Sequence, residues 1–195
     1  MTDDHLPAPE NLHWNLPKSL PESLLKNLEG NRSFMMKKIL IASDHAGFEG
    51  KEAVKKTLDD MGVEYEDLGT VSLESVDYPD YAERVARGVA GGEAERGILV
   101  CGSGIGMQIA ANKIPGVRAA LAWNEETAEL ARRHNDANVV AVGARTTPQE
   151  TIDRIIRAFL TTDFEGGRHQ RRIEKIKKLE EETQDFKRIS STNEH

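Results

Sequence analysis

The chain has 195 residues, of which 38% are hydrophobic, 30% charged and 5% aromatic. This length fits one domain of ordinary size with short tails, and such a domain buries a core without disulfides or metals. The 26 Lys and Arg against 33 Asp and Glu give a net charge of −7, which argues against a nucleic-acid binder, so an anionic ligand needs a local basic cluster. The single cysteine, Cys101, excludes an internal disulfide framework and a multi-cysteine zinc or iron–sulfur site.

Residues 1–35 differ in composition from the rest of the chain. They contain four of the seven prolines, and their first residues are acidic where a signal peptide would be basic. No apolar run approaches the roughly 20 residues that span a membrane. We therefore expect an irregular N-terminal arm on a soluble protein that contacts no membrane. A lone thiol also fits the reducing cytoplasm, where we expect the protein to be located.

From residue 36 the chain alternates short apolar runs with helical patterns. Strands are predicted at 38–43, 63–68, 97–101, 117–122 and 139–142, and helices at 48–61, 81–90, 107–113, 124–134 and from 148 onward. This alternation indicates right-handed βαβ crossovers and a parallel sheet covered on both faces. The predicted fold is α/β: a three-layer α/β/α doubly wound sandwich with a five-stranded, Rossmann-like parallel sheet over residues 36–165, plus a C-terminal helix.

The last segment, 166–195, is highly charged and is predicted to be helical from Arg168. Its apolar residues form only a narrow stripe: Ile173, Ile176, Leu179, Thr183 and Phe186. Two interpretations stay open, a solvated helix and a helix that lies on a partner subunit. Because so thin a stripe favours a groove over isolation, we expect the helix to pack on a partner.

Doubly wound sheets bind ligands beyond the carboxyl ends of their strands. The third predicted strand ends in Cys101-Gly-Ser-Gly-Ile-Gly106. Three glycines let the backbone approach a ligand and aim several N–H groups at one point, which suits an anion or a developing oxyanion. A dinucleotide-binding turn is the alternative, and Glu125 and Glu126 lie near the spacing of a ribose-binding acid. Met107 occupies its third glycine position, however, and such a turn normally follows the first strand.

Cys101 stands at the base of this turn. A lone cysteine at a strand end is commonly an inert buried side chain. Here the converging N–H groups and the start of a helix would favour the thiolate. A thiolate beside an oxyanion pocket suits nucleophilic attack or proton abstraction next to a carbonyl.

Two histidines are further candidates. His45 follows Asp44 at the end of the first predicted strand, and His134 comes just before the fifth. Either could be a structural or surface histidine, but we expect both to lie where the sheet places its ligand. No set of His, Asp and Glu has the spacing of a zinc site, so no metal is predicted.

Arginines supply the positive charge that a phosphate would need. Arg168 and Arg172 are four residues apart, on one face of the opening C-terminal helix, and Arg145 follows the fifth predicted strand. Guanidinium groups bind phosphate through paired hydrogen bonds. Arginine-rich helix starts are also common surface features, so both interpretations stay open.

Six short motifs follow one another between Met36 and Lys187. They are Ser43-Asp-His-Ala-Gly-Phe48, Asp77-Tyr-Pro79, Cys101-Gly-Ser-Gly-Ile-Gly106, Ala111-Asn-Lys113, Arg133-His-Asn-Asp136 and Glu165-Gly-Gly-Arg-His-Gln170. Together they resemble the type B ribose-5-phosphate isomerases, in a group that includes galactose-6-phosphate and allose-6-phosphate isomerases. The resemblance covers everything except the N-terminal arm.

The resemblance implies an aldose–ketose isomerase of the pentose phosphate pathway that works through an enediolate without metal or organic cofactor. It implies Cys101 as the proton-transfer base and His134, helped by Asp44, as the group that opens the sugar ring. The turn that would bind the enediolate oxygen consists of Gly102, Ser103, Gly104, Ile105 and Gly106, with Ser103 also counted as catalytic. The residues implied to hold the rest of the sugar phosphate are Asp44, His45, Tyr78, Asn135, Arg145, Arg168 and Arg172.

The resemblance also implies a homodimer or homotetramer with each site built from two subunits. Some relatives carry a carboxylate base elsewhere, so Cys101 places this sequence in the thiol subgroup. A six-carbon phosphosugar isomerase, acting on allose 6-phosphate or galactose 6-phosphate, remains an alternative on the same scaffold. A phosphosugar-binding module without catalysis is the further alternative.

Overall fold

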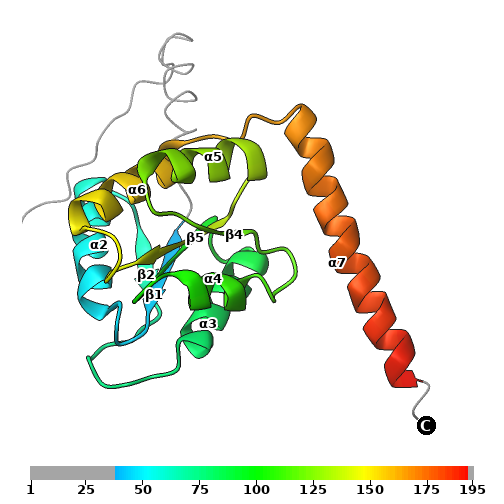
Figure 1. Ribbon diagram of the computed structural model, residues 1–195, viewed down its shortest axis with the longest axis horizontal. Coiled ribbons are helices and arrows are strands. Elements are labelled where there is room, and N and C mark those ends of the chain that lie inside the picture. The colour runs from blue at the N-terminus through cyan, green and yellow to red at the C-terminus, as the bar shows by residue number, and fades with distance from the viewer. Residues whose placement is uncertain (1–37, 193–195) are drawn as a thin grey trace, which may run out of the picture. The chain divides into compact units, whose positions relative to one another are not determined.

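The computed structural model describes residues 38–192, with side chains through residue 186. The predicted arm at 1–35 lies outside the described residues, so it stays a prediction. Five strands alternate with six helices over the described range (Figure 1). In chain order they are β1 (Ile39–Ser43), α2 (Phe48–Asp60), β2 (Tyr65–Asp67), α3 (Tyr78–Ala90), β3 (Arg96–Cys101), α4 (Ile105–Ala111), β4 (Ala119–Leu121), α5 (Glu125–Asn135), β5 (Val139–Gly143), α6 (Gln149–Thr161) and α7 (Arg168–Thr192).

The five strands form one sheet in the order β2-β1-β3-β5-β4, and every neighbouring pair is parallel. All residues of β1, β3 and β5 are buried, as expected of central parallel strands with both faces covered. From β1 the chain first adds β2 on one side and then β3 on the other. The carboxyl ends of β1 and β3 therefore meet at the switch point, where doubly wound sheets bind ligands.

Helices cover both faces of the sheet, so the predicted three-layer α/β/α sandwich is confirmed. On one face Val54 of α2 and Ile155 of α6 pack in a single apolar cluster, to which α5 contributes small residues. On the other face Val85 of α3 and Met107 of α4 occupy a second cluster. Burying a large aliphatic side chain contributes about 1.5–3 kcal/mol, so the helices are held mainly by these apolar stripes.

Helix α3 begins earlier than the sequence predicts. The apolar pattern indicates a helix from Tyr81, but the structure begins it at Tyr78, with Asp77 at the N-cap and Pro79 in the first turn. Proline fits there because the first turn of a helix needs no N–H donor from it. The shift matters for the site, since it places Tyr78 on the helix rather than in the loop.

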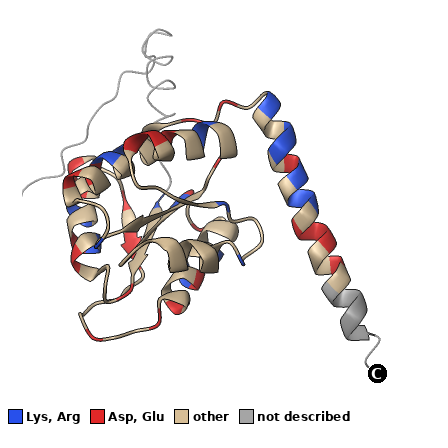
Figure 2. Cartoon of the chain, viewed as in Figure 1, with Lys and Arg blue, Asp and Glu red and all other residues tan. Residues whose placement is uncertain are grey.

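Helix α7 is most deeply buried near its beginning, and its middle still reaches the loop before β4. Ile173 is only 3% exposed, whereas Leu179 is 62% exposed, and Glu180 Oε2 accepts a hydrogen bond from the Gly116 N–H at 3.0 Å. Basic residues gather at the start of α7 and acidic residues follow (Figure 2). Among the described residues, no helix combines the length and the apolarity needed to cross a membrane.

Candidate functional site

The turn after β3 brings backbone N–H groups against the thiol of Cys101. Cys101 is 5% exposed, and its Sγ accepts a hydrogen bond from the Gly104 N–H at 3.1 Å. Gly104 makes this possible with a left-handed backbone (φ 79°, ψ −23°), a conformation that glycine adopts without the penalty of a Cβ. The predicted juxtaposition of thiol and glycine turn is therefore present in the structure.

The end of β1 lies beside this turn. Asp44 is buried, and its Oδ1 accepts the Gly47 N–H at 2.8 Å. His45 Nδ1 accepts the Val76 N–H at 3.2 Å, so in the neutral ring the hydrogen is on Nε2. A Cβ on Gly47 would lie 2.1 Å from the Val100 carbonyl oxygen, which shows how closely the segment after β1 packs on β3.

A cleft of about 580 Å³ opens next to these residues, and His45, Leu73 and Arg145 are among its lining residues. The Arg145 N–H donates to the Gly102 carbonyl at 3.0 Å. The Tyr78 ring covers Gly106, because a Cβ there would lie 2.7 Å from the ring. The predicted site residues gathered at this carboxyl edge are Asp44, His45, Tyr78, Cys101, Gly102, Ser103, Gly104, Ile105, Gly106 and Arg145.

The remaining predicted site residues lie at the opposite edge of the sheet. His134 and Asn135 end α5, which returns the chain to the start of β5. Arg168 and Arg172 belong to the first turns of α7. The expectation that His134 lies at the ligand-binding carboxyl edge of its own sheet is therefore wrong. A helix in a βαβ unit begins near the carboxyl edge and ends near the amino edge, and the six residues of β3 separate the two edges by about 16 Å.

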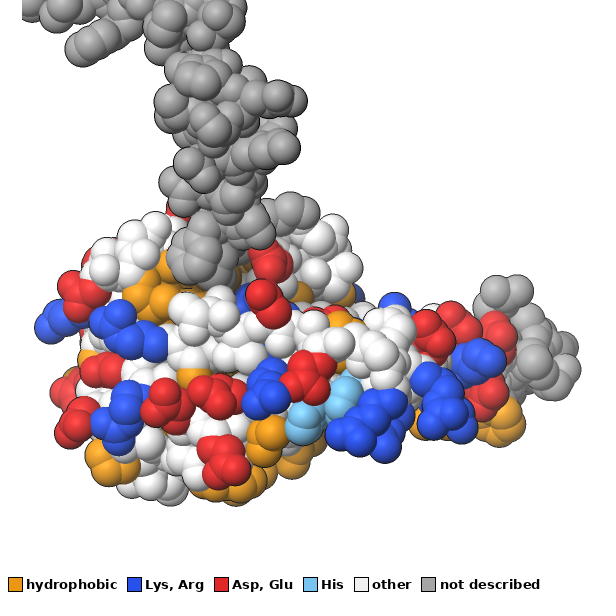
Figure 3. All heavy atoms as spheres, turned by 90° about the horizontal axis from the view of Figure 1, so that it is seen from above, with side chains coloured by type: hydrophobic (Ala, Val, Ile, Leu, Met, Phe, Trp, Pro, Cys, Tyr) orange, Lys and Arg blue, Asp and Glu red, His pale blue; other side chains and the backbone are white. Residues whose placement is uncertain are grey.

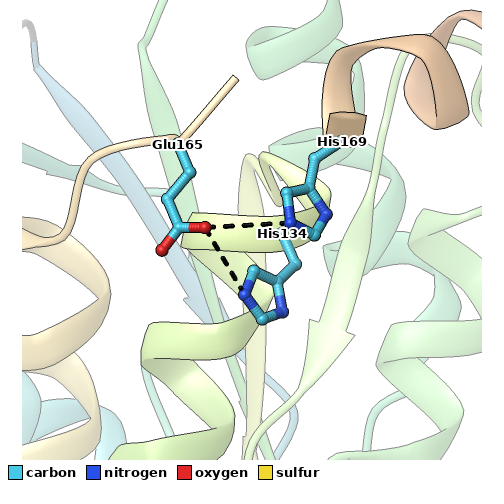
Figure 4. A group of neighbouring side chains, drawn as sticks. All are labelled: His134, Glu165 and His169. Atoms are coloured by element: carbon cyan, nitrogen blue, oxygen red, sulfur yellow. Dashed lines mark ion pairs between the residues drawn. The ribbon is translucent and has the colours of Figure 1, made fainter. Parts of the chain in front are cut away.

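Two side chains that the sequence analysis gave no role complete this second group. Glu165 lies on the loop between α6 and α7, and His169 is in the first turn of α7. Figure 4 shows that Glu165 points toward both His134 and His169, and its Oε2 lies 3.6 Å and 3.7 Å from their Nε2 atoms. The two imidazole rings are stacked, with centroids 4.3 Å apart and planes inclined by 4°. We call His134, Glu165 and His169 the amino-edge cluster.

Basic side chains lie beside the amino-edge cluster, and Figure 3 shows pale blue histidine side chains next to blue Lys and Arg side chains. Arg133 Nε donates to Glu165 Oε1 at 2.6 Å, and this hydrogen bond holds the pKa of the Glu165 carboxyl below its usual value. Arg168 Nε donates to His169 Nε2 at 3.2 Å. Burial, followed by the charges of His134, Arg168 and Arg172, lowers the pKa of His169. Glu165 is therefore ionised and His169 neutral near pH 7.

The ligand atoms of the amino-edge cluster all lie within 4.8 Å of one another, which raises the question of a metal ion. A zinc ion needs the in-plane lone pair of each imidazole to point at one centre about 2.0–2.1 Å away. Two parallel stacked rings direct their lone pairs along separate planes. Nearby arginines also oppose a cation. The geometry suits hydrogen bonding and proton handling better than metal binding.

Comparisons with known proteins all find similarity to one family of isomerases. The ribose/galactose isomerase family matches residues 39–176. Ribose-5-phosphate isomerase B of Escherichia coli (strain K12) is 48% identical over 146 residues, which cover 75% of this chain and 98% of that protein. The type B ribose 5-phosphate isomerase of Trypanosoma brucei has a structure similar to this one, with a TM-score of 0.72, 53% identity, and coverage of 74% of this chain and 99% of that one. A structure of ribose-5-phosphate isomerase B from Mycoplasma genitalium with bound ribulose-5-phosphate matches with a TM-score of 0.72 and 44% identity over 74% of this chain and 97% of that one.

Proposed function

The chain belongs to the ribose/galactose isomerase family, and on this premise we propose that it interconverts D-ribose 5-phosphate and D-ribulose 5-phosphate through an enediolate. One observation carries the proposal: the Cys101 thiol lies against the N–H of Gly104 at the switch point of the sheet. A base and a set of fixed N–H donors at one point are what aldose–ketose isomerisation requires. The reaction would belong to the pentose phosphate pathway.

Proton transfer is the step assigned to the carboxyl edge. Cys101 removes the proton from C2 of the open-chain aldose and returns it to C1, while the O2 hydroxyl proton passes to O1, so that C2 becomes the ketone and C1 the hydroxymethyl carbon. Ser103 lies in the adjoining turn. The hydrogen on a carbon next to a carbonyl is only weakly acidic, so the base needs help from groups that stabilise the enediolate oxygen. The N–H groups of residues 102–106 provide this help, and one such donor contributes about 3–4 kcal/mol to transition-state stabilisation.

Ring opening and part of the phosphate binding are assigned to the amino edge of a second copy of the chain. His134 opens the furanose ring with help from Asp44, and Asn135 holds the substrate. Arg168 and Arg172 bind the phosphate together with His45 and Arg145. The sheet separates Cys101 and His134 of one chain by about 16 Å, far beyond hydrogen-bond reach, so the two act on one substrate only across an interface.

Exposed apolar side chains at the carboxyl edge support a shared site. Ile105 and Ile109 on α4 are each 51% exposed, and Trp123 after β4 is 60% exposed. Ile105 and Ile109 are one helical turn apart, and neighbouring exposed apolar side chains mark protein interaction surfaces. Leu179, 62% exposed, continues the apolar stripe of α7. The expected assembly is a homodimer or homotetramer in the cytoplasm, with α7 lying on the partner.

A mixing experiment tests both the reaction and the shared site. Cys101→Ala and His134→Asn are purified separately and also co-expressed with different tags. Each variant alone should lose ribose 5-phosphate turnover by about 10²- to 10⁴-fold. Mixed dimers carry one intact site, so a random mixture should recover about a quarter of wild-type activity.

Several results would decide against parts of this proposal. Full ribose 5-phosphate activity in Cys101→Ala would remove the role of that thiol. An absence of recovery in mixed dimers would place both residues in one chain's site. Faster turnover of allose 6-phosphate or galactose 6-phosphate than of ribose 5-phosphate would replace the pentose substrate, and binding without turnover would favour a phosphosugar-binding module. Activity should be unchanged by EDTA, and dependence on a metal would contradict the mechanism.

A further inference from the structure

Glu165 connects three elements at the amino edge, although the proposed reaction gives it no role. Its backbone N–H donates to the Arg133 carbonyl at 3.1 Å, and its carboxylate accepts the Arg133 guanidinium through Oε1. The other carboxylate oxygen, Oε2, faces the Nε2 atoms of both histidines (Figure 4). The loop before α7 is thus fastened to the end of α5 at the residue next to His134.

The hydrogen-bond pattern distinguishes the two stacked rings. His169 Nε2 accepts from Arg168 Nε, so the neutral His169 ring carries its hydrogen on Nδ1. The Nε2 atom of His134 faces an ionised carboxylate oxygen at 3.6 Å. A carboxylate beside one imidazole nitrogen favours the tautomer with the hydrogen on that nitrogen, as in acid–histidine pairs of hydrolases. Apo contacts of this kind are commonly long and shorten when substrate binds.

Positively charged side chains lie near the pair. They are Arg133 on α5 and Arg168 and Arg172 on α7. Within the described part of the chain, Glu165 is the one carboxylate that pairs with either ring. Removing its charge would leave the two imidazoles among three guanidinium groups without a negative partner. The ring of His169 stacks on the ring of His134, with centroids 4.3 Å apart, and so limits how far the His134 ring can tilt.

We infer that Glu165 is a positioning residue that holds His134 in the tautomer with hydrogen on Nε2, leaving Nδ1 to face the sugar ring of the substrate. This inference rests on the proposed function for the role of His134 in ring opening. Glu165 itself contacts neither the substrate nor the reacting atoms. It acts through His134, as partners outside the reacting set orient the groups that react.

The test combines imidazole nitrogen chemical shifts with kinetics. Long-range proton–nitrogen correlation spectra of the full chain report the tautomer of each histidine, and the spectrum of His134→Asn identifies the His134 signals. In wild type His134 should carry its hydrogen on Nε2, and in Glu165→Gln the population should move toward Nδ1. The same variant should lower kcat for ribose 5-phosphate about 10- to 100-fold, with KM within about threefold because binding groups are untouched. Glu165→Asp keeps the carboxylate and should recover part of the loss.

Glu83→Gln is the matched control. Glu83 Oε1 accepts Arg87 Nε at 2.7 Å on the surface of α3, the same pair of atoms as in the bond between Arg133 and Glu165. This variant should leave the His134 signals and kcat unchanged. A wild-type His134 with its hydrogen on Nδ1, or identical His134 spectra in wild type and Glu165→Gln, would overturn the inference. A wild-type hydrogen on Nδ1 would overturn the inference even where Glu165→Gln fails to fold. A wild-type chain that does not isomerise ribose 5-phosphate would instead refute the proposed function, and the tautomer result would stand apart from it.

Discussion

Replacing Gly104 with alanine adds one methyl group and tests whether the turn after β3 needs a glycine at this position. The backbone of Gly104 is left-handed, and its N–H donates to Cys101 Sγ. A Cβ at Gly104 would lie 2.5 Å from Leu121 Cδ1 and 3.0 Å from the Val142 carbonyl carbon. The leucine tip can move, but the backbone of β5 cannot move without disturbing the sheet. We therefore predict that Gly104→Ala both destabilises the protein and lowers its activity.

The size of the effect follows from two costs. A left-handed backbone costs an L-residue about 1–2 kcal/mol. Overpacking a well-packed position costs about 1–3 kcal/mol, so the free energy of unfolding should fall by about 2–5 kcal/mol. In a protein of this size each kcal/mol lowers Tm by about 2–4 °C, which gives a fall of at least about 4 °C. Displacing one aligned N–H donor should lower kcat about 10²- to 10³-fold.

Gly102→Ala provides the control within the same turn. Gly102 is absent from the residues with positive φ, and a Cβ there would make ordinary contacts of 3.5 Å with Ala46 Cβ and Arg145 Cδ. Thermal unfolding and ribose 5-phosphate turnover are measured for both variants. Gly102→Ala should change the free energy of unfolding by less than about 1 kcal/mol. Equal losses in the two variants, or a Gly104→Ala protein with wild-type Tm and kcat, would refute this account of the turn.

Two further predictions concern buried charge. Lys51 is fully buried and donates to both Asp67 oxygens at 2.6 Å and to the Thr70 carbonyl at 2.7 Å. Lys51→Met should therefore lower the free energy of unfolding, measured by urea denaturation, by about 3 kcal/mol. Adding Asp67→Asn should recover part of the lost stability. The pKa of His169 is lowered by burial, so the unfolded chain takes up a proton first and stability should fall as pH drops below about 6.5. His169→Gln should flatten that part of the curve of stability against pH, and an unchanged slope would contradict the assignment of this pH dependence to His169. The lowered pKa of Glu165 affects stability in a separate, more acidic range.

Most of the fold can be predicted from the sequence because the apolar runs and helical spacings that indicate it are local patterns. The apolar runs before Ser43, Cys101 and Gly143 become fully buried strands, and the i, i+3, i+4 spacing of Ile152, Ile155 and Ile156 becomes the buried face of α6. The first residue of α3 is harder to predict from the sequence. Its first turn contains Pro79, which marks a loop in the sequence but is also acceptable at the beginning of a helix.

The sequence by itself determines the half of the site that is continuous in the chain. Cys101 and the glycines after it are neighbours, so their meeting needs only a strand that ends and a turn that glycine permits. The tertiary structure alone decides where His134 goes. Its helix carries it to the opposite edge from Cys101 and brings it against Glu165 and His169, which are separated from it in the chain by β5 and α6. Residue spacing does not contain that contact, because it depends on how parallel strands and crossover helices return the chain to the amino edge of the sheet.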